Sequence, residues 1–479
     1  MTLYAEIIRE VEESPSGPQI GAFFDLDGTL IATFSAFAFM REGIRTGLVT
    51  ASAFGDAVLT ALRFQSGQLS FSGFVTNTTK ILRNQSEKEF AAMGERIFEE
   101  NLATQIYPES RALVDAHRRK GHTLAVVSAA TSYQIAPFAR DLNIPNVLCT
   151  GLEVRNGKFT GSLIRPTCYG EGKAIHARRL ARRRKVRMSR SYFYTDSEED
   201  LPLLDAVGNP RPTNPNRRLR EIATARGWPM RSFHSRGTPG VAEVVRTALA
   251  TGSLLPSFLL GIPAYAFDGS WRRVVNLATA TWGELGTALA GIDVQVSGEQ
   301  HLWSHRPAVF IFNHQSGIDT LLLAKLLRRD MVGIAKQELK RNPLFGPIFS
   351  MAGTVFIDRF NREKAIEAMK PAIDTLRQGI SITIAPEGTR SPTPRLGRFK
   401  KGAFHLAMAA KVPIVPIVFR NALDALPKHA FIVRPAVIEA VVLPPISTET
   451  WTADNLDERI EEIHRMYEET LDLGAVGEG

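Results

Sequence analysis

Short apolar runs, each followed at once by polar residues, recur along the 479-residue chain and constrain its fold more than any other feature. Segments long enough for a helix separate these runs, and strands that alternate with helices form a parallel sheet. Polar residues after such strands gather at one edge of the sheet, where α/β proteins bind their ligands. We therefore predict an α/β fold. The runs are residues 20–26 before DGTL, then TLAVVS, YFYTD, PAVFIFNH, VGIAKQEL, TVFIDR, ISITIAPEGTR and PIVPIVF.

Length and composition divide the chain into two domains. At 479 residues it exceeds the roughly 150 that one core usually takes, and 44% hydrophobic with 22% charged residues exclude a disordered chain. A proline- and arginine-rich stretch at 209–236 is typical of a segment that closes one domain and leads to the next. We expect a first domain at 1–236 with a mostly helical stretch at about 33–105, a linker at 237–252, and a second domain at 253–479.

Cysteine usage and the N-terminal residues bear on the compartment. Cys149 and Cys168 are too few for a disulfide framework or a multi-cysteine zinc site, so we expect a reducing compartment. The chain starts MTLYAEIIREVEESPSG, with acidic residues where a secretory signal would be basic, so we predict no signal peptide.

One basic segment accounts for the positive charge. Lys and Arg number 58 against 49 Asp and Glu, a net charge of +9, and eight basic residues with no acid lie between Arg178 and Arg190. Without a zinc finger, an RRM signature or an alternating basic and aromatic pattern, we do not expect nucleic acid as the partner. The segment is either a solvated helix face or a contact with an anionic membrane surface.

Residues 253–291 hold the most apolar stretch. SLLPSFLLGIPAYAF is uncharged for 15 residues, whereas a spanning helix needs about 20. Trp271 and Trp282 follow among aliphatic residues, a composition typical of a membrane interface. We expect amphipathic helices that hold the protein peripherally or monotopically on the cytoplasmic side of the cell membrane. The alternative is a helix pair that packs on its own domain.

The first cluster of polar residues predicts phosphoryl transfer. Asp25 and Asp27 follow a strand and face the same side, and two carboxylates so close repel each other unless a cation lies between them. Mg²⁺ is the expected cation. Ser128 ends the strand LAVVS, Lys173 begins a helix, and Asp196 ends YFYTD with Asp200 four residues later.

The order Asp-x-Asp, Ser, Lys, Asp-xxx-Asp resembles the haloacid dehalogenase-like phosphatases, most closely the phosphoserine phosphatase branch with a helical cap, over residues 18–235. The resemblance implies a Rossmann-like parallel sheet, with the cap at about 33–105. It further implies that Asp25 attacks phosphorus, that Asp27 acts as acid and base, and that Ser128 and Lys173 bind the phosphate. The Mg²⁺ ligands would come from Asp25, Asp27 and Asp196, supported by Asp200.

Position 34 departs from that family. Phosphoserine phosphatases carry an acidic residue nine positions after the nucleophile, where this chain has Phe34 in the apolar run FSAFAFM. We therefore expect an apolar, lipid-like phosphomonoester rather than phosphoserine.

The second cluster predicts a histidine base. In NHQSGID, His314 lies in the turn after a strand and Asp319 in the first turn of the next helix, close enough to orient one imidazole nitrogen. The other nitrogen is then free to take a proton from a hydroxyl. No G-x-S-x-G motif is nearby, which favours direct attack by the substrate oxygen over an acyl-enzyme.

NHQSGID, GTVFIDR, PEGTRS and VPIVPI together resemble the glycerolipid acyltransferases of the 1-acylglycerol-3-phosphate type, over about 253–445. The resemblance implies an α/β domain, with His314 as base, Asp319 as its orienting partner and a lysophospholipid as acceptor. The acyl donor would be a thioester, either acyl-CoA or acyl carrier protein. The expected phosphate- and substrate-binding residues are Arg359, Glu387, Gly388, Thr389 and Arg390.

We thus expect a bifunctional enzyme of phospholipid biosynthesis, which makes phosphatidate by acyl transfer and hydrolyses a phosphomonoester with Mg²⁺ through an aspartyl-phosphate. Two alternatives stay open. In one, the phosphatase-like domain is a non-catalytic regulatory or binding module. In the other, the basic segment makes the chain a scaffold for acidic partners.

Overall fold

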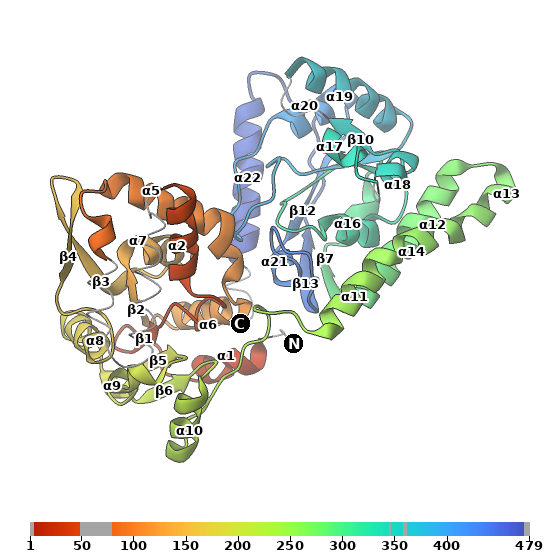
Figure 1. The fold of residues 1–479 in the computed structure, drawn as a ribbon. Helices are drawn as coiled ribbons and strands as arrows, with labels where there is room; N and C mark the ends of the chain where they lie inside the picture. The colour runs from red at the N-terminus through yellow and green to blue at the C-terminus, as the bar shows by residue number, and fades with distance from the viewer. Residues whose placement is uncertain (1–3, 48–78, 344–345, 358–361, 474–479) are drawn as a thin grey trace. The chain divides into compact units, whose positions relative to one another are not determined.

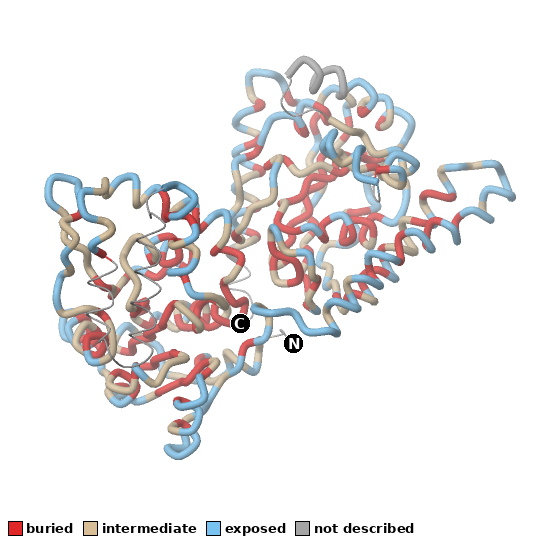
Figure 2. Tube along the Cα trace, in the orientation of Figure 1, coloured by how far each residue is buried: buried red, intermediate tan, exposed pale blue. Residues whose placement is uncertain are grey.

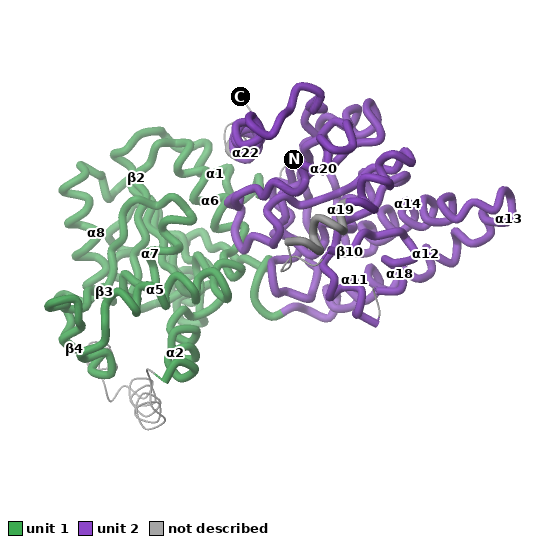
Figure 3. The backbone as a smooth tube through the Cα atoms, turned by 90° about the horizontal axis from the view of Figure 1, so that it is seen from above, with its two compact units in different colours: residues 1–238 green, residues 239–479 purple. Residues whose placement is uncertain are grey.

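A computed structural model describes residues 4–47, 79–343, 346–357 and 362–473. The chain forms two compact units, residues 1–238 and 239–479, and each is described by itself (Figures 1 and 3). Much of the expected cap falls at residues 48–78, which lie outside the described residues. In both units the buried residues lie on strands and on the helices that pack against them (Figure 2).

Unit 1 is built on a six-stranded sheet in the order β4-β3-β2-β1-β5-β6, parallel except for the β3–β4 pair. Apolar residues alternate between the two faces: Phe24 of β1 and Tyr194 of β5 pack on one side, and Phe23 and Phe193 on the other. The strands are β1 Gly21–Phe24, β2 Thr123–Thr131, β3 Asn146–Arg155, β4 Lys158–Ile164, β5 Tyr192–Thr195 and β6 Asn209–Pro212.

Helices cover both faces of this sheet, as a parallel sheet requires (Figure 1). Helices α1 and α6 contact each other, as do α8 and α9. The helices are α1 Ala5–Glu12, α2 Ser35–Arg45, α5 Glu87–Ile97, α6 Pro108–Arg119, α7 Ser132–Asp141, α8 Glu171–Arg184, α9 Leu201–Leu204 and α10 Arg217–Arg226, with a π-helical turn at Phe98–Leu102 and 3-10 turns at Lys80–Leu82, Ala103–Gln105, Met188–Arg190 and Glu198–Asp200.

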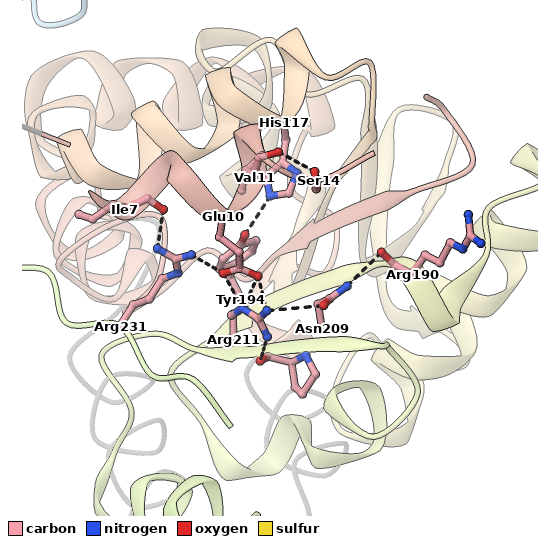
Figure 4. A network of polar contacts seen from close by, with 11 residues as sticks. Ile7, Glu10, Val11, Ser14, His117, Arg190, Tyr194, Asn209, Arg211 and Arg231 are labelled. Carbon is pink, nitrogen blue, oxygen red and sulfur yellow. Dashed lines mark hydrogen bonds and ion pairs between the residues drawn. The ribbon is translucent and has the colours of Figure 1, made fainter. Parts of the chain in front are cut away.

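The expectation that residues 209–236 only close the domain is wrong for part of that stretch, because Asn209–Pro212 forms strand β6. Proline lacks a backbone N–H, but β6 is an edge strand, where that donor is not required on both sides. Arg211 of β6 and Arg231 both bind the Glu10 carboxylate of α1 (Figure 4). The first helix is thereby tied to the edge of the sheet.

Unit 2 contains a seven-stranded sheet in the order β10-β9-β11-β8-β12-β13-β7. All pairs are parallel except β12–β13. Phe310 and Phe312 of β8 pack on one face, and Val309 and Ile311 on the other. The strands are β7 Ile292–Ser297, β8 Val309–Phe312, β9 Met331–Lys336, β10 Val355–Ile357, β11 Ser381–Ile384, β12 Ile414–Phe419 and β13 Ala436–Val442.

Helices pack around this sheet, and α11 to α14 form a hairpin that projects beyond it (Figure 1). They are α11 Val241–Gly252, α12 Leu254–Gly261, α13 Tyr265–Asp268, α14 Trp271–Ala290, α15 His301–Ser304, α16 Asp319–Leu327, α17 Gln337–Lys340, α18 Gly346–Met351, α19 Arg362–Arg377, α20 Gly402–Ala410, α21 Ala422–Ala425 and α22 Leu456–Leu473, with a 3-10 turn at Ile262–Ala264.

The expected linker at 237–252 is largely helical, since α11 begins at Val241 and packs on α14. Only half of the residues in VAEVVRTALATG are good helix formers, so its packing on α14 rather than its composition accounts for the helix. The helical run Val241–Asp268 has the length and apolar composition to cross a membrane, and 33% of its most apolar window is buried.

Candidate functional sites

A buried lysine and two carboxylates form the centre of the site in unit 1. Asp25 follows β1, Asp200 follows β5, and Lys173 lies in the first turn of α8. The Lys173 Nζ lies 3.1 Å from Asp25 Oδ1 and 2.8 Å from Asp200 Oδ2, and all three residues are buried. Thr195 Oγ1 donates to Asp200 Oδ2 at 2.5 Å. Burial alone would lower the pKa of Lys173, but the two carboxylates outweigh it and raise that pKa.

Asp27 is held by the first residue of the helix that opens the cap region. Its Oδ1 accepts from the Ser35 N–H at 2.7 Å, and its Oδ2 lies 3.2 Å from Ser35 Oγ. Gln134 of α7 donates in turn to Ser35 Oγ at 3.3 Å. Burial raises the pKa of Asp27 to about 6, against the opposing effect of the Ser35 hydrogen bonds. A carboxyl with this pKa can both give and take a proton near neutral pH.

Asp196 adds a further carboxylate at the end of β5. A side chain at Gly28 would place its Cβ 2.3 Å from Asp196 Oδ2, so only glycine fits there, and its φ of +73° also favours glycine. Burial raises the pKa of Asp196 to about 7 and that of Asp25 well above its ordinary value, with Lys173 opposing both. Asp25 and Asp200 therefore contact the Lys173 ammonium, and Asp27 and Asp196 lie close enough to raise the pKa of Asp25.

A divalent cation fits this donor set. Burial is the main cause of the raised pKa values of Asp25 and Asp196, and repulsion by neighbouring carboxylates adds to it. A bound cation would oppose both effects, and hard oxygen ligands suit Mg²⁺. Among the described residues, no point is surrounded by three or more His, Cys, Asp or Glu side chains. Asp27 and Asp200, which we expected near the metal, have their carboxylates engaged by Ser35 and by Lys173 with Thr195.

Ser128 lies within β2, the neighbour of β1, and is buried. Its hydroxyl accepts from the Ala130 N–H at 3.2 Å, in the segment where the β2–β3 register is interrupted. The expectation that Ser128 ends its strand is wrong, because β2 continues to Thr131, but Ser128 does lie on the strand beside β1.

The site in unit 2 contains a histidine–aspartate pair. His314 follows β8, and Asp319 begins α16. His314 Nδ1 lies 2.7 Å from Asp319 Oδ2, which also accepts from the N–H groups of Gln315 and Ser316 at 3.1 Å each. A carboxylate accepts only, so Nδ1 carries the proton and Nε2 is the free base. Asp319 is buried, whereas the His314 side chain is 28% exposed.

Glu387 borders this site and binds its backbone. Its Oε1 accepts from the His314 N–H at 2.7 Å, and its Oε2 accepts from the Gly397 N–H at 2.8 Å. Burial raises the pKa of Glu387, against the two backbone donors. With both oxygens engaged, Glu387 fixes the turn that carries the histidine. The expected role of Glu387 in binding the substrate stays a prediction.

Of the remaining expected phosphate-binding residues, Arg390 lies near the same turn. Arg390 Nη1 is 3.4 Å from where a Cβ would lie on Gly317, so its guanidinium reaches the His314–Asp319 turn. Gly388 has φ +75°, and a Cβ added there would lie 2.7 Å from the Lys400 ammonium. Thr389 is exposed. Arg359 lies outside the described residues.

An apolar cavity of about 140 Å³ is separated from the histidine by the Phe312 ring, and it is bounded by α12, α14, α16, α18 and the β8, β9 and β11 strands. Phe312 lines it and makes an edge-on contact with the His314 ring, with centroids 5.8 Å apart. The indole N–H of Trp282 is buried at its wall without a partner among the described residues. Further lining residues are Phe258, Leu323, Ile334 and Ile348.

The sequence identified Asp319 as the partner of His314, but it did not identify Ser35 or the contact of Glu387 with the His314 turn. The backbone N–H of Ser35 donates to the Asp27 carboxylate, and the backbone N–H of His314 donates to the Glu387 carboxylate. A polar residue at the start of the helix at 35–45 was the available signal for Ser35. The cavity has no signal in the sequence, because its walls come from segments far apart.

Comparisons with known proteins match both halves of the chain. A profile of the haloacid dehalogenase-like hydrolases matches residues 22–205, and an acyltransferase profile matches residues 293–420. The 1-acyl-sn-glycerol-3-phosphate acyltransferase of Limnanthes alba is 37% identical over 231 residues, covering 48% of this chain and 79% of that protein.

A probable phosphatase of Mycobacterium tuberculosis is 33% identical over 217 residues, 44% of this chain and 75% of that protein. The solved structure of a 1-acyl-sn-glycerophosphate acyltransferase from Thermotoga maritima is 22% identical with a TM-score of 0.42, covering 48% of this chain and 95% of that one. The profiles and the relatives confirm both resemblances read from the motifs.

Proposed function

This chain belongs to the 1-acyl-sn-glycerol-3-phosphate acyltransferases in its second unit and to the haloacid dehalogenase-like hydrolases in its first, and on that premise we propose a bifunctional enzyme of phospholipid biosynthesis. Unit 2 would transfer an acyl group from acyl-CoA or acyl carrier protein to 1-acylglycerol 3-phosphate and yield phosphatidate. Unit 1 would hydrolyse a phosphomonoester. The observation that carries the proposal is the 2.7 Å contact between His314 and Asp319 beside an apolar cavity.

In the acyl transfer, His314 Nε2 takes the proton from the acceptor hydroxyl as its oxygen attacks the thioester carbonyl. The imidazolium so formed is stabilised by Asp319 at Nδ1, and it then returns the proton to the leaving thiolate. Arg390 binds the acceptor phosphate, which a guanidinium suits, and Arg359 is proposed to do the same. The cavity beside Phe312 receives the acyl chain.

In the phosphatase, the Asp25 carboxylate attacks phosphorus, and Asp27 gives its proton to the departing alcohol oxygen. Asp27 then takes a proton from the water that hydrolyses the aspartyl-phosphate. Lys173 and Ser128 bind the phosphoryl oxygens. We propose that the carboxylates of Asp25 and Asp196 and the Asp27 carbonyl hold Mg²⁺, with Asp200 in a supporting place. Bound there, Mg²⁺ would neutralise charge on the transferring phosphoryl group.

Membrane association is proposed for unit 2. Thirteen of the 21 large apolar side chains exposed in the described residues lie at residues 241–285, on the α11–α14 hairpin. An exposed apolar surface of this kind indicates a membrane or protein contact. Insertion into the cytoplasmic leaflet would let both amphiphilic substrates reach the cavity, which α12 and α14 line.

The basic segment at 178–190 is proposed to contact anionic lipid rather than nucleic acid. All eight of its basic side chains are exposed. The segment leads away from the catalytic carboxylates, toward the other end of the strands. Lys173 at the start of α8 contacts Asp25, whereas the Arg187 N–H donates to the Gln19 carbonyl, which precedes β1. The segment would therefore bind a surface without delivering substrate.

The test is mass spectrometry of lipids after incubation of the full chain with acyl-CoA, lysophosphatidate and Mg²⁺, with parallel reactions that omit Mg²⁺ or replace acyl-CoA by acyl carrier protein. New phosphatidate supports unit 2. Inorganic phosphate that appears only with Mg²⁺ supports unit 1. Phosphatidate without any phosphate release from a broad set of phosphomonoesters would favour the alternative in which unit 1 only regulates or binds.

A further inference from the structure

Two exposed aromatic side chains stand beside the residue that holds Asp27. Phe34 precedes Ser35 and is 54% exposed, and Phe37, one helical turn on, is 67% exposed. Their rings meet edge to face with centroids 6.1 Å apart. Phe39, by contrast, is buried in the core of unit 1. The pair thus forms an apolar surface that the described part of unit 1 leaves in water.

The position of this surface is set by the catalytic contacts. Both oxygens of Asp27 contact Ser35, the first residue of α2, so the start of that helix is fixed against the carboxyl. Asp27 is the residue proposed to protonate the leaving alcohol, whose oxygen must therefore come within hydrogen-bond reach of it. The rest of that alcohol lies next to the start of α2. Residues 28–40, which include this turn, carry no charged side chain.

We propose that the substrate of unit 1 is a phosphomonoester of an apolar alcohol, with an alkyl or acyl chain that packs against Phe34 and Phe37. This inference rests on the proposed phosphatase and names its substrate class. A serine leaving group has nothing apolar to bury on the pair, whereas a hydrocarbon chain would cover both rings. The acylglycerol phosphates proposed as acceptor and product of unit 2 belong to the same class.

The size of the effect follows from the burial of methylene groups. A fully buried methylene favours binding by roughly four-fold, and partial burial by less. The catalytic efficiency, kcat/KM, should therefore rise about two- to four-fold for each carbon added while the chain still covers the rings. Chain length leaves the phosphate and the ester bond unchanged, so the slope reports the alcohol site alone.

The experiment measures phosphate release by the full chain with Mg²⁺ on n-alkyl phosphates of increasing length, all kept below their micelle concentrations, and on phosphoserine. We expect kcat/KM to increase with chain length in the wild type and phosphoserine to be among the poorest substrates. The double variant Phe34→Gln, Phe37→Gln should flatten the slope. Phe34→Leu, Phe37→Leu should keep most of it. Hydrolysis of the shortest alkyl phosphate at the wild-type rate by the glutamine variant would show that α2 is still folded. Ile164→Gln, at a 57% exposed side chain of β4, is the matched control and should keep the full slope.

Each outcome decides one point. If no phosphomonoester is hydrolysed faster by the wild type than by Asp25→Asn, the phosphatase itself fails. If hydrolysis occurs but the wild-type slope is flat or negative, the phosphatase stands and the apolar site is overturned. A slope that survives in the double glutamine variant overturns the assignment to Phe34 and Phe37.

Discussion

The two candidate sites lie at the same place in their sheets, after parallel strands, yet their charges differ. In unit 1, carboxylates at Asp25, Asp27, Asp196 and Asp200 gather around buried Lys173. In unit 2, one partly exposed histidine meets one carboxylate beside an apolar cavity.

The difference follows from the reactions proposed. A transferring phosphoryl group is highly negative, so its site needs cations. The same cations balance the negative charge of the carboxylates that take part in the reaction. An acyl transfer from a thioester needs one proton acceptor and room for hydrocarbon. Polar residues at the ends of parallel strands can thus serve phosphoryl transfer or acyl transfer, depending on the groups with which they are paired.

The largest effect should come from Asp25→Asn. It removes the proposed nucleophile, so phosphate release should fall by more than about 10⁴-fold while acyl transfer stays unchanged. Phosphate assays and lipid mass spectrometry on the same preparation measure both. Asp205→Asn, at an exposed residue of the same unit, is the control. Unchanged phosphate release in Asp25→Asn would assign the turnover elsewhere.

His314→Ala should give the converse result. Loss of a general base lowers acyl transfer by about 10²- to 10⁴-fold, and phosphate release should be unaffected. His405→Ala tests a histidine that is exposed on α20 of the same unit. Initial rates with acyl-CoA and lysophosphatidate measure the effect. If the two histidine variants lose activity equally, His314 is not a specific base.

Glu387→Gln should have an intermediate effect on unit 2. The amide offers one acceptor oxygen, so either the His314 or the Gly397 N–H would face a second donor, a loss of about 1–3 kcal/mol. Misplacement of the His314 turn should lower acyl transfer by roughly 10- to 100-fold. Glu461→Gln, on the exposed side of α22, is the matched control. Full activity in Glu387→Gln would contradict the positioning role.

The smallest effect should come from a residue remote from both sites. Glu10→Gln weakens the contacts of α1 with Arg211 and Arg231, so amide exchange in α1 should quicken while both activities persist (Figure 4). Burial alone would raise the pKa of Glu10, but the two arginines lower it below 4.5. The stabilisation is therefore complete above about pH 4.5 and is lost as the pH falls through the lowered pKa.

Hydrogen exchange by mass spectrometry measures this prediction, with Glu6→Gln, at an exposed residue of the same helix, as control. Equal exchange of α1 in the two variants would show that the arginine contacts do not hold the helix. Lost phosphatase activity in Glu10→Gln would instead couple α1 to the catalytic site.

Sequence alone identified the strands that lead into each site and the local parts of each site. The apolar runs at 20–26 and at PAVFIFNH became β1 and β8, because short β-rich runs between helices have few other ways to bury both faces. His314 and Asp319 are only five positions apart, in a turn that leads into a helix. Such a short segment keeps the two side chains close to each other.

Contacts between distant segments were decided by the tertiary structure. Lys173 lies 148 positions after Asp25 and Glu387 lies 73 after His314, so only the order of strands in the sheet places them. The strand at 209–212 shows the same limit, because its prolines are tolerated only by virtue of its edge position. The cavity in unit 2 and the contact of Ser35 with Asp27 likewise depend on how the helices pack. The order of residues in the sequence does not give the distances between packed segments.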